Sequence, residues 1–185
     1  NVTHLDCQNV LLKTEEDGPQ LVGIGLENLI AIAMKDAFLI SDKNRSQDVK
    51  LLVQKLKRKR LPEAEYFPRD YRPWGWFEVL NSAAFYKVKK ILVNPNSSLS
   101  LQSHKYRSEH WVIVRGVAEV TLNQKVKLLN EGESIFIPVG AKHRLSNRKN
   151  KNLIIIEIQT GTYFGEDDII RYDDNYGRKI ISKNK

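Results

Sequence analysis

The chain has 185 residues, of which 41% are hydrophobic, so it can bury the core of one domain together with a smaller unit. Its formal net charge is +8, but part of this surplus is local to residues 55–60, where cations suit a helix end, so we expect no nucleic-acid partner. The single cysteine excludes an internal disulfide and no apolar run reaches the ~18 residues of a membrane helix, so we expect a cytoplasmic chain without membrane contact.

The first 42 residues predict short strands separated by turns. Apolar runs are followed by turn sequences such as Asp17-Gly18-Pro19 and Glu27-Asn28. The runs cover residues 10–12, 21–24, 29–32 and 37–40. Their spacing is short and fairly even, so they could stack as coils of a small β-helix or pair in a sheet.

A helix and a linker are predicted next. Ser46 can cap the N-terminus of this helix, and apolar residues then recur at helical spacing between Val49 and Leu56. Pro62 lies just beyond the basic cluster that closes the helix, within a linker over residues 61–71. We therefore expect a first unit over residues 1–70 and a second over residues 71–185.

From Tyr71 onward the pattern is almost entirely that of β-strands. Turns rich in Asn, Pro and Gly separate the runs, as at residues 94–96 and 130–132. The predicted strands cover residues 77–80, 86–89, 90–93, 111–114, 118–122, 125–129, 134–137 and 153–158. Many short antiparallel strands within about 100 residues predict a sandwich or a barrel.

Polar residues in two segments of this β-rich region have a spacing that suits one metal site. Gln102 and His104 are two residues apart, so on a strand both side chains point to one face. Glu109 follows five residues later, where the next strand can return it to the same cavity, and His143 follows a distant Pro-x-Gly turn. An amide oxygen, two imidazoles and a carboxylate suit a divalent metal with open positions for a substrate.

These two segments resemble the sequence motifs of the cupin family. Residues 132–147 meet every element of the second motif, which is Gly, five residues, Pro-x-Gly, two residues, His, three residues and Asn. The positions of the first motif are occupied by Asn96, Gln102, His104, Glu109 and Gly116. Asn can replace the first glycine because it tolerates positive φ, and a glutamine replaces the first histidine. The resemblance implies an all-β fold, a cupin jelly-roll β-barrel, preceded by a small β-rich segment with one α-helix.

A longer stretch resembles the C-terminal half of type II phosphomannose isomerase/mannose-1-phosphate guanylyltransferase. The resemblance covers essentially all of residues 71–178 and is carried by residues 71–75, 99–104, 107–111, 165–171 and 174–178. It implies interconversion of mannose 6-phosphate and fructose 6-phosphate, in a bifunctional enzyme that also makes GDP-mannose from mannose 1-phosphate and GTP for polysaccharide biosynthesis.

Residues 1–60 resemble the end of the guanylyltransferase half of the same enzymes. They contain no Gly-rich nucleotide loop of the kind that opens such a half. We therefore expect no GDP-mannose synthesis from this chain alone, and a missing N-terminal nucleotidyltransferase half as its partner. A homodimer is left open.

The resemblance also implies roles for individual residues. The metal, expected to be Zn²⁺, would be held by Gln102, His104, Glu109 and His143 and would act as a Lewis acid on the sugar oxygens. The candidates for phosphate binding are Arg107, Arg171 and Arg178, because a guanidinium donates two hydrogen bonds at once. The candidates for proton transfer are Glu157, which lies in an apolar run, and Lys105, and Arg107 joins the catalytic set because it lies between two ligands.

Other functions remain open. Lys105 and Tyr106 stand where the family usually has histidines, which favours a non-catalytic cupin that binds sugar or metal and supports a nucleotidyltransferase half. An iron-dependent oxygenase would more commonly keep a histidine-rich set, and Gln102 argues against it. A third alternative is a chain that assists nucleotidyl transfer only when it is joined to its missing half.

Overall fold

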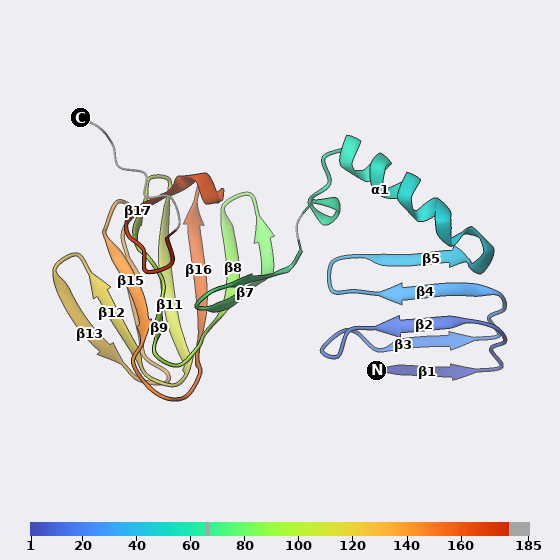
Figure 1. Ribbon diagram of the computed structural model, residues 1–185, viewed down its shortest axis with the longest axis horizontal. Coiled ribbons are helices and arrows are strands. Elements are labelled where there is room, and N and C mark those ends of the chain that lie inside the picture. Colours follow the sequence, from blue (N-terminus) through green and yellow to red (C-terminus); the bar gives the residue numbers. More distant parts are fainter. Residues whose placement is uncertain (66, 178–185) are drawn as a thin grey trace. The chain divides into compact units, whose positions relative to one another are not determined.

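The computed structural model describes residues 1–65 and 67–177 (Figure 1). The chain divides into two compact units, Asn1–Pro68 and Arg69–Lys185, so the division falls two residues before the boundary expected near residue 70. Strands dominate both units. The predicted β-rich fold with one α-helix is confirmed.

The first unit is a small parallel β-helix that ends in a helix. Its elements are β1 (Val2–Leu5), β2 (Leu11–Thr14), β3 (Leu21–Ile24), β4 (Leu29–Ala33), β5 (Phe38–Asp42), the 3₁₀ turn η1 (Lys43–Asp48), α1 (Val49–Arg58) and the 3₁₀ turn η2 (Pro62–Ala64). β1 pairs with β3 and β2 pairs with β4, and both pairs are parallel. β5 adds to the second pair as the antiparallel neighbour of β4. Stacked coils, rather than a single sheet, are therefore what the even spacing of the apolar runs produces.

The two coils are related by a 19-residue repeat in the sequence. Asn9 and Asn28 occupy equivalent corners, and Nδ2 of Asn9 donates a hydrogen bond of 2.7 Å to Oδ1 of Asn28. Both residues have positive φ, 53° and 52°, a conformation that asparagine tolerates better than most residues. The stacked amides therefore fix the register of one coil on the next.

The helix starts later than the sequence predicted. Ser46 does not cap it, because residues 43–48 form the separate 3₁₀ turn η1, whose own cap is the side chain of Asp42 accepting from the backbone N–H of Asn44. α1 then begins at Val49 and ends in a basic last turn, as predicted. No helix in the described part of the chain is long and apolar enough to cross a membrane.

The second unit consists of two facing antiparallel sheets. Its elements are β6 (Arg69–Arg72), β7 (Gly75–Ala83), β8 (Tyr86–Val93), β9 (Ser97–Ser98), β10 (Leu101–His104), β11 (Arg107–Arg115), β12 (Ala118–Leu122), β13 (Lys125–Leu129), β14 (Ser134–Ile137), β15 (His143–Asn147), β16 (Leu153–Gly161), the 3₁₀ turn η3 (Glu166–Asp168) and β17 (Ile169–Asp173). One sheet has the order β13-β12-β15-β10-β17, with β9 beside β15, and the other has the order β14-β11-β16-β8-β7-β6. Residues 86–93, predicted as two strands, form the single strand β8.

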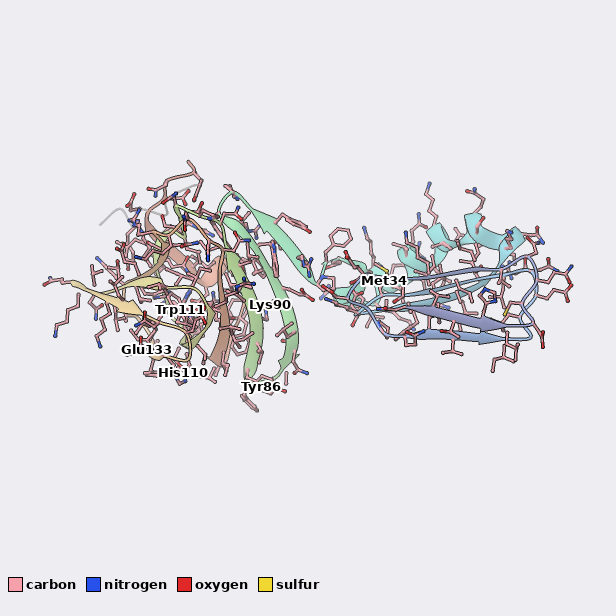
Figure 2. All side chains as sticks on the ribbon, turned by 90° about the horizontal axis from the view of Figure 1, so that it is seen from below. Met34, Tyr86, Lys90, His110, Trp111 and Glu133 are labelled. Carbon is pink, nitrogen blue, oxygen red and sulfur yellow. The ribbon has the colours of Figure 1, made fainter. Side chains whose placement is uncertain are left out.

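The interior of this barrel changes from apolar at one end to polar at the other. Along β11 the buried residues Trp111 and Ile113 follow the buried residue Glu109, and alternate residues such as His110 face outward (Figure 2). β16 has the same gradient in reverse, so that Ile113 pairs with Ile155 and Glu109 pairs with Gln159. The apolar end forms the core, and the polar end leaves a layer of charged side chains inside the barrel.

Candidate metal centre

Three potential metal ligands converge in the polar end of the barrel. His104 ends β10, Glu109 lies near the start of β11, and His143 begins β15. One ligand atom from each lies within 4.8 Å of the others, and none of the three residues is more than 2% exposed. The cluster can therefore hold a metal ion, as predicted, with two imidazole nitrogens and one carboxylate as donors.

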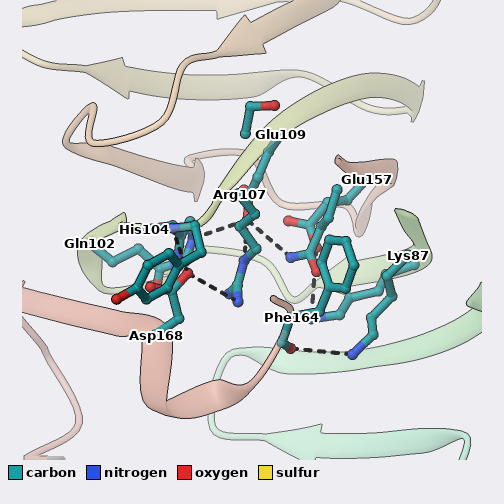
Figure 3. Close-up of polar contacts among 12 residues, drawn as sticks. Lys87, Gln102, His104, Arg107, Glu109, Glu157, Phe164 and Asp168 are labelled. Atoms are coloured by element: carbon teal, nitrogen blue, oxygen red, sulfur yellow. Dashed lines mark hydrogen bonds and ion pairs between the residues drawn. The ribbon is translucent and has the colours of Figure 1, made fainter. Parts of the chain in front are cut away.

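Strand pairing within one sheet, together with the facing position of the other sheet, explains why these residues meet. Gln102 on β10 is the direct antiparallel partner of His143 on β15, so their side chains are neighbours on one face. His104 is two residues further along β10 and shares that face, whereas Glu109 comes from the opposite sheet. Figure 3 shows Gln102 beside His104, with Glu109 above them in the view.

Gln102 is the fourth predicted ligand, and it lines the cavity together with Glu109. Its amide oxygen Oε1 accepts a hydrogen bond of 2.9 Å from Oγ of Ser100. This bond orients the amide and leaves the second lone pair of the oxygen for another partner. Its assignment as a ligand stays a prediction.

The hydrogen bonding of the histidines fits a metal. Nδ1 of His143 donates a hydrogen bond of 2.9 Å to the backbone oxygen of Ala141. The lone pair of Nε2, which lies 3.6 Å from Glu109, is therefore free to bind a metal ion. Among the described residues, neither Nε2 of His143 nor the ring nitrogens of His104 have a hydrogen-bond partner, although His104 lies 3.0 Å from Glu109. Buried polar atoms without partners are costly, and a bound cation would satisfy them.

The electrostatics of the cluster keep Glu109 and His143 in the states that bind metals. Burial alone would raise the pKa of Glu109, but contact with His104 and the proximity of His143 and Arg107 hold it well below its ordinary range. Burial lowers the pKa of His143 from its ordinary value of 6.5. A carboxylate and a neutral imidazole are the forms that coordinate a metal.

A cavity opens beside the cluster and is lined by charged side chains. Its cationic lining residues are Arg72, Lys89, Arg107 and Arg171, and its acidic ones are Glu109, Glu157 and Glu166. A bound divalent cation would add to the positive side, so the cavity suits a small anionic molecule.

Glu157 is the buried acid that faces this cavity from β16. Nε2 of Gln159 donates to Glu157 at 2.9 Å and to Glu109 at 3.0 Å, and Nε1 of Trp111 lies within hydrogen-bonding distance of the same two carboxyl groups. Burial and then the charge of Glu109 raise the pKa of Glu157 to about 8, against the opposing effect of Lys89. At neutral pH in the absence of metal, Glu157 therefore holds a proton.

This raised pKa predicts how the stability of the metal-free protein depends on pH. A carboxyl whose pKa is higher in the folded state stabilises the fold below its unfolded pKa, near 4.5, and this stabilisation is lost as the pH rises towards 8. Between pH 6.5 and 8 we expect wild type to lose up to about 1.4 kcal/mol per pH unit relative to Glu157→Gln, which retains every other titrating group. Urea unfolding of both metal-free proteins over this range measures the difference, and parallel curves would contradict it.

The three arginines predicted to bind phosphate differ in where they lie relative to the cavity. Arg107 lies inside the barrel and is 2% exposed, with Nη1 donating to the backbone oxygen of Gly165 and Nε 3.6 Å from Glu109. Arg171 lines the cavity from β17, directly opposite Gln102 on β10. Arg178 lies outside the described residues.

Lys105 is not brought to the cavity. It lies exposed in the turn between β10 and β11, with its ammonium group over the ring of Tyr106 at 5.5 Å, and it is not among the residues that line the cavity. The strand ends at His104, so the alternation that points Gln102 and His104 inward does not extend to Lys105. Glu157 is therefore the proton-transfer candidate that the geometry retains.

Two residues that line the cavity were not predicted, although the alternation of side chains along their strands indicates that they face inward. Lys89 shares one face of β8 with the buried residues Ile91 and Val93, so strict alternation places it inside. Gln159 follows Glu157 by two residues and therefore faces the same way. Two further residues, Arg72 and Asp168, reach the site only through the pairing of distant strands, and no alternation in the sequence indicates their position.

Two family models match this chain. The model described as mannose-6-phosphate isomerase C-terminal matches residues 60–174, and the model described as MannoseP isomerase/GMP-like beta-helix domain matches residues 1–56. The two matches correspond in sequence order to the barrel and to the β-helix.

Curated relatives match over most of the chain. Xanthan biosynthesis protein XanB of Xanthomonas campestris pv. campestris is 42% identical over 96% of this chain and 38% of its own length. Mannose-1-phosphate guanylyltransferase ManC of Salmonella typhimurium is 45% identical over 84% of this chain and 32% of its own length. This chain thus spans about a third of the length of these relatives.

The fold also resembles that of solved structures. An oxalate decarboxylase of Lactobacillus farciminis, solved in complex with formate, superposes with a TM-score of 0.50 at 18% identity, over 56% of this chain and 33% of its own. At this identity the similarity concerns the fold alone. The cupin barrel predicted from the two motifs is confirmed.

Proposed function

The chain belongs to the mannose-6-phosphate isomerase C-terminal family, and from this membership we propose that it interconverts mannose 6-phosphate and fructose 6-phosphate with a bound divalent metal. The observation that carries the proposal is the buried cluster of His104, Glu109 and His143 beside a cavity lined by cationic side chains. A bound Zn²⁺ ion, our expected metal, would supply a Lewis acid for the sugar oxygens. Formation of mannose phosphates for a polysaccharide would fit the relative named as a xanthan biosynthesis protein.

Glu157 is proposed to carry the proton between the two reacting carbons. Aldose–ketose isomerisation takes a proton from one carbon and returns it to its neighbour through an enediol. A carboxyl group with a pKa of about 8 lies near the working pH, where one group can both accept and release a proton. Lys89, whose Nζ is 3.8 Å from Oε2 of Glu157, would stabilise the charged form during this exchange.

The cationic residues of the cavity are proposed to bind the phosphate and orient the sugar. Arg171 is the better candidate for direct contact, because it lines the cavity and is partly exposed, whereas Arg107 is buried and held among Gly165, Glu109 and Asp168. Binding the phosphate away from the reacting carbons would supply orientation without disturbing the chemistry.

The proposal is tested by assaying conversion of mannose 6-phosphate into fructose 6-phosphate with and without a chelator. We expect conversion that the chelator abolishes and that added Zn²⁺ restores. Absence of conversion by the metal-loaded protein would reject the isomerase function.

A second function is favoured by Lys105 and Tyr106, which stand where the resembled family has histidines. A non-catalytic cupin that binds the metal and sugar phosphate, and supports a nucleotidyltransferase half, would be consistent with relatives named as guanylyltransferases. It predicts metal and mannose 6-phosphate binding without turnover. GDP-mannose synthesis by this chain alone is not expected under either function.

We expect Arg171→Ala to weaken phosphate recognition specifically. Loss of a charge-assisted hydrogen-bonding partner costs roughly 1.5–3 kcal/mol, so affinity for mannose 6-phosphate should fall about tenfold or more. Calorimetric titration with mannose 6-phosphate and with free mannose measures the change, which should be confined to the phosphorylated sugar.

Arg148→Ala provides the matched control for this measurement. Arg148 forms an ion pair of 3.0 Å with Glu119 and is 57% exposed, so its loss should leave both affinities unchanged. Equal binding of the two sugars by wild type would contradict a phosphate pocket in this cavity.

A further inference from the structure

We propose that Asp168 is a positioning residue of the metal centre, because its carboxylate fixes the short corner of chain between the ligands His104 and Glu109. Asp168 ends the 3₁₀ turn η3, and neither cupin motif includes it. The inference rests on the metal centre of the proposed function but not on isomerase activity.

The corner is the point where the chain passes from one sheet to the other. β10 ends at His104 and β11 begins at Arg107, and these strands belong to different sheets, so Lys105 and Tyr106 alone make the crossing. Both of these residues are exposed and contribute no buried side chain that would hold the corner. The direction in which the two ligands leave the corner therefore depends on backbone contacts.

Asp168 provides two of those contacts. Its Oδ1 accepts a hydrogen bond of 2.9 Å from the backbone N–H of Lys105, and its Oδ2 accepts one of 3.4 Å from that of Tyr106. Asp168 is only 6% exposed, and the next residue, Ile169, pairs with His104 in the sheet. One buried carboxylate thus binds both N–H groups of the corner.

Arg107 extends this arrangement to the second ligand. Its Nη1 lies 3.8 Å from Oδ2 of Asp168, and its Nε lies 3.6 Å from Oε1 of Glu109 (Figure 3). The carbonyl of His104 also accepts a hydrogen bond of 2.8 Å from Gly140, in the turn before His143. A shift of the corner would therefore change the position of His104 relative to both other ligands.

The effect of losing Asp168 on metal affinity follows from the role of residues that hold metal ligands in place. Residues that orient ligands without touching the ion typically change metal affinity about 10- to 100-fold when they are removed. Replacement of the carboxylate by an amide, as in Asp168→Asn, is the most selective change. The amide oxygen could still accept one hydrogen bond from the corner, but the NH₂ group would face a donor.

The test compares Asp168→Asn and Asp168→Ala with wild type, using the whole metal-free chain and Co²⁺ or Zn²⁺ as probes. Affinity is measured by competition with a chelator, and the visible absorption of bound Co²⁺ reports the geometry of its ligands. Asp167→Asn is the matched control, because Asp167 lies in the same turn but is exposed and accepts a hydrogen bond from the hydroxyl of Tyr163 rather than from the corner. Far-UV circular dichroism and thermal unfolding of the metal-free proteins monitor the fold.

We expect both Asp168 variants to bind metal about 10- to 100-fold more weakly, with an altered Co²⁺ spectrum, while Asp167→Asn behaves as wild type. Lower thermal stability with unchanged affinity and spectrum would overturn the inference, since Asp168 would then support only the barrel. Loss of the fold in the nearly isosteric Asp168→Asn would overturn it for the same reason. Because affinity and spectrum are measured without substrate, a wild type that binds metal but lacks isomerase activity would reject the function and leave this inference standing.

Discussion

Replacing His143 by alanine is expected to remove the metal from the protein while leaving the barrel folded. His143 supplies one of the three clustered donors, and its Nε2 is held towards Glu109 by the hydrogen bond from Nδ1 to Ala141. Losing a ligand should weaken metal binding more than the roughly 10- to 100-fold caused by losing a residue that only orients a ligand. Elemental analysis after dialysis, with a parallel isomerase assay, measures the effect.

The barrel should survive this change because the cost to the metal-free fold is limited. His143 packs against Trp111 in an edge-to-face contact, and a buried truncation of this kind costs about 1–3 kcal/mol against a total stability of roughly 5–15 kcal/mol. His110→Ala is the control, since His110 is exposed and its ring contacts Ser134 and Phe136 on the neighbouring strand rather than the cluster. Stoichiometric metal in His143→Ala would show that the ligand set is wrong.

Glu157→Gln is expected to lower kcat by about 10²- to 10⁴-fold, the usual contribution of a general acid–base group. The amide has nearly the same shape and can still accept the hydrogen bond from Trp111, so the variant should retain the metal and bind mannose 6-phosphate. The group lost is the one whose pKa burial and Glu109 raise to about 8. Steady-state kinetics with metal analysis of the same samples separates kcat from binding.

Glu119→Gln is the matched control for this second prediction. Glu119 lies on β12 and pairs with Arg148 outside the barrel, so the same change of charge there should leave kcat and KM unaltered. If Glu157→Gln keeps the kcat of wild type, the proton must be moved by another group.

Much of the fold could be predicted because its signals are local. Alternation along residues 107–115 and 153–161 separates the buried face from the exposed one, and the positive φ expected for Asn96 is observed at 53°. The predicted cap at Ser46 was wrong because a 3₁₀ turn intervenes before the helix, and competing hydrogen bonds decide such boundaries.

The metal cluster could be predicted from spacing, but its surroundings could not. Gln102 and His104 share a strand face by periodicity alone, and the motif supplied Glu109 and His143. Lys105 became a candidate because it follows His104 at a position where the resembled family has a histidine, yet the strand ends before it and its side chain is exposed. Nearness in sequence places a side chain near a site only while the regular structure continues.

The sequence by itself determined which residues face the interior of each strand, and through the motifs it determined the family and three clustered ligand candidates. Only the tertiary structure decided which interior residues meet: Glu157 with Lys89 across two strands, and Asp168 with a corner 63 residues away in sequence. The reason is physical, since periodicity fixes the direction of a side chain relative to its own backbone. The pairing and register of distant strands, which set the distances between side chains, depend on how two whole sheets bury their apolar faces against each other.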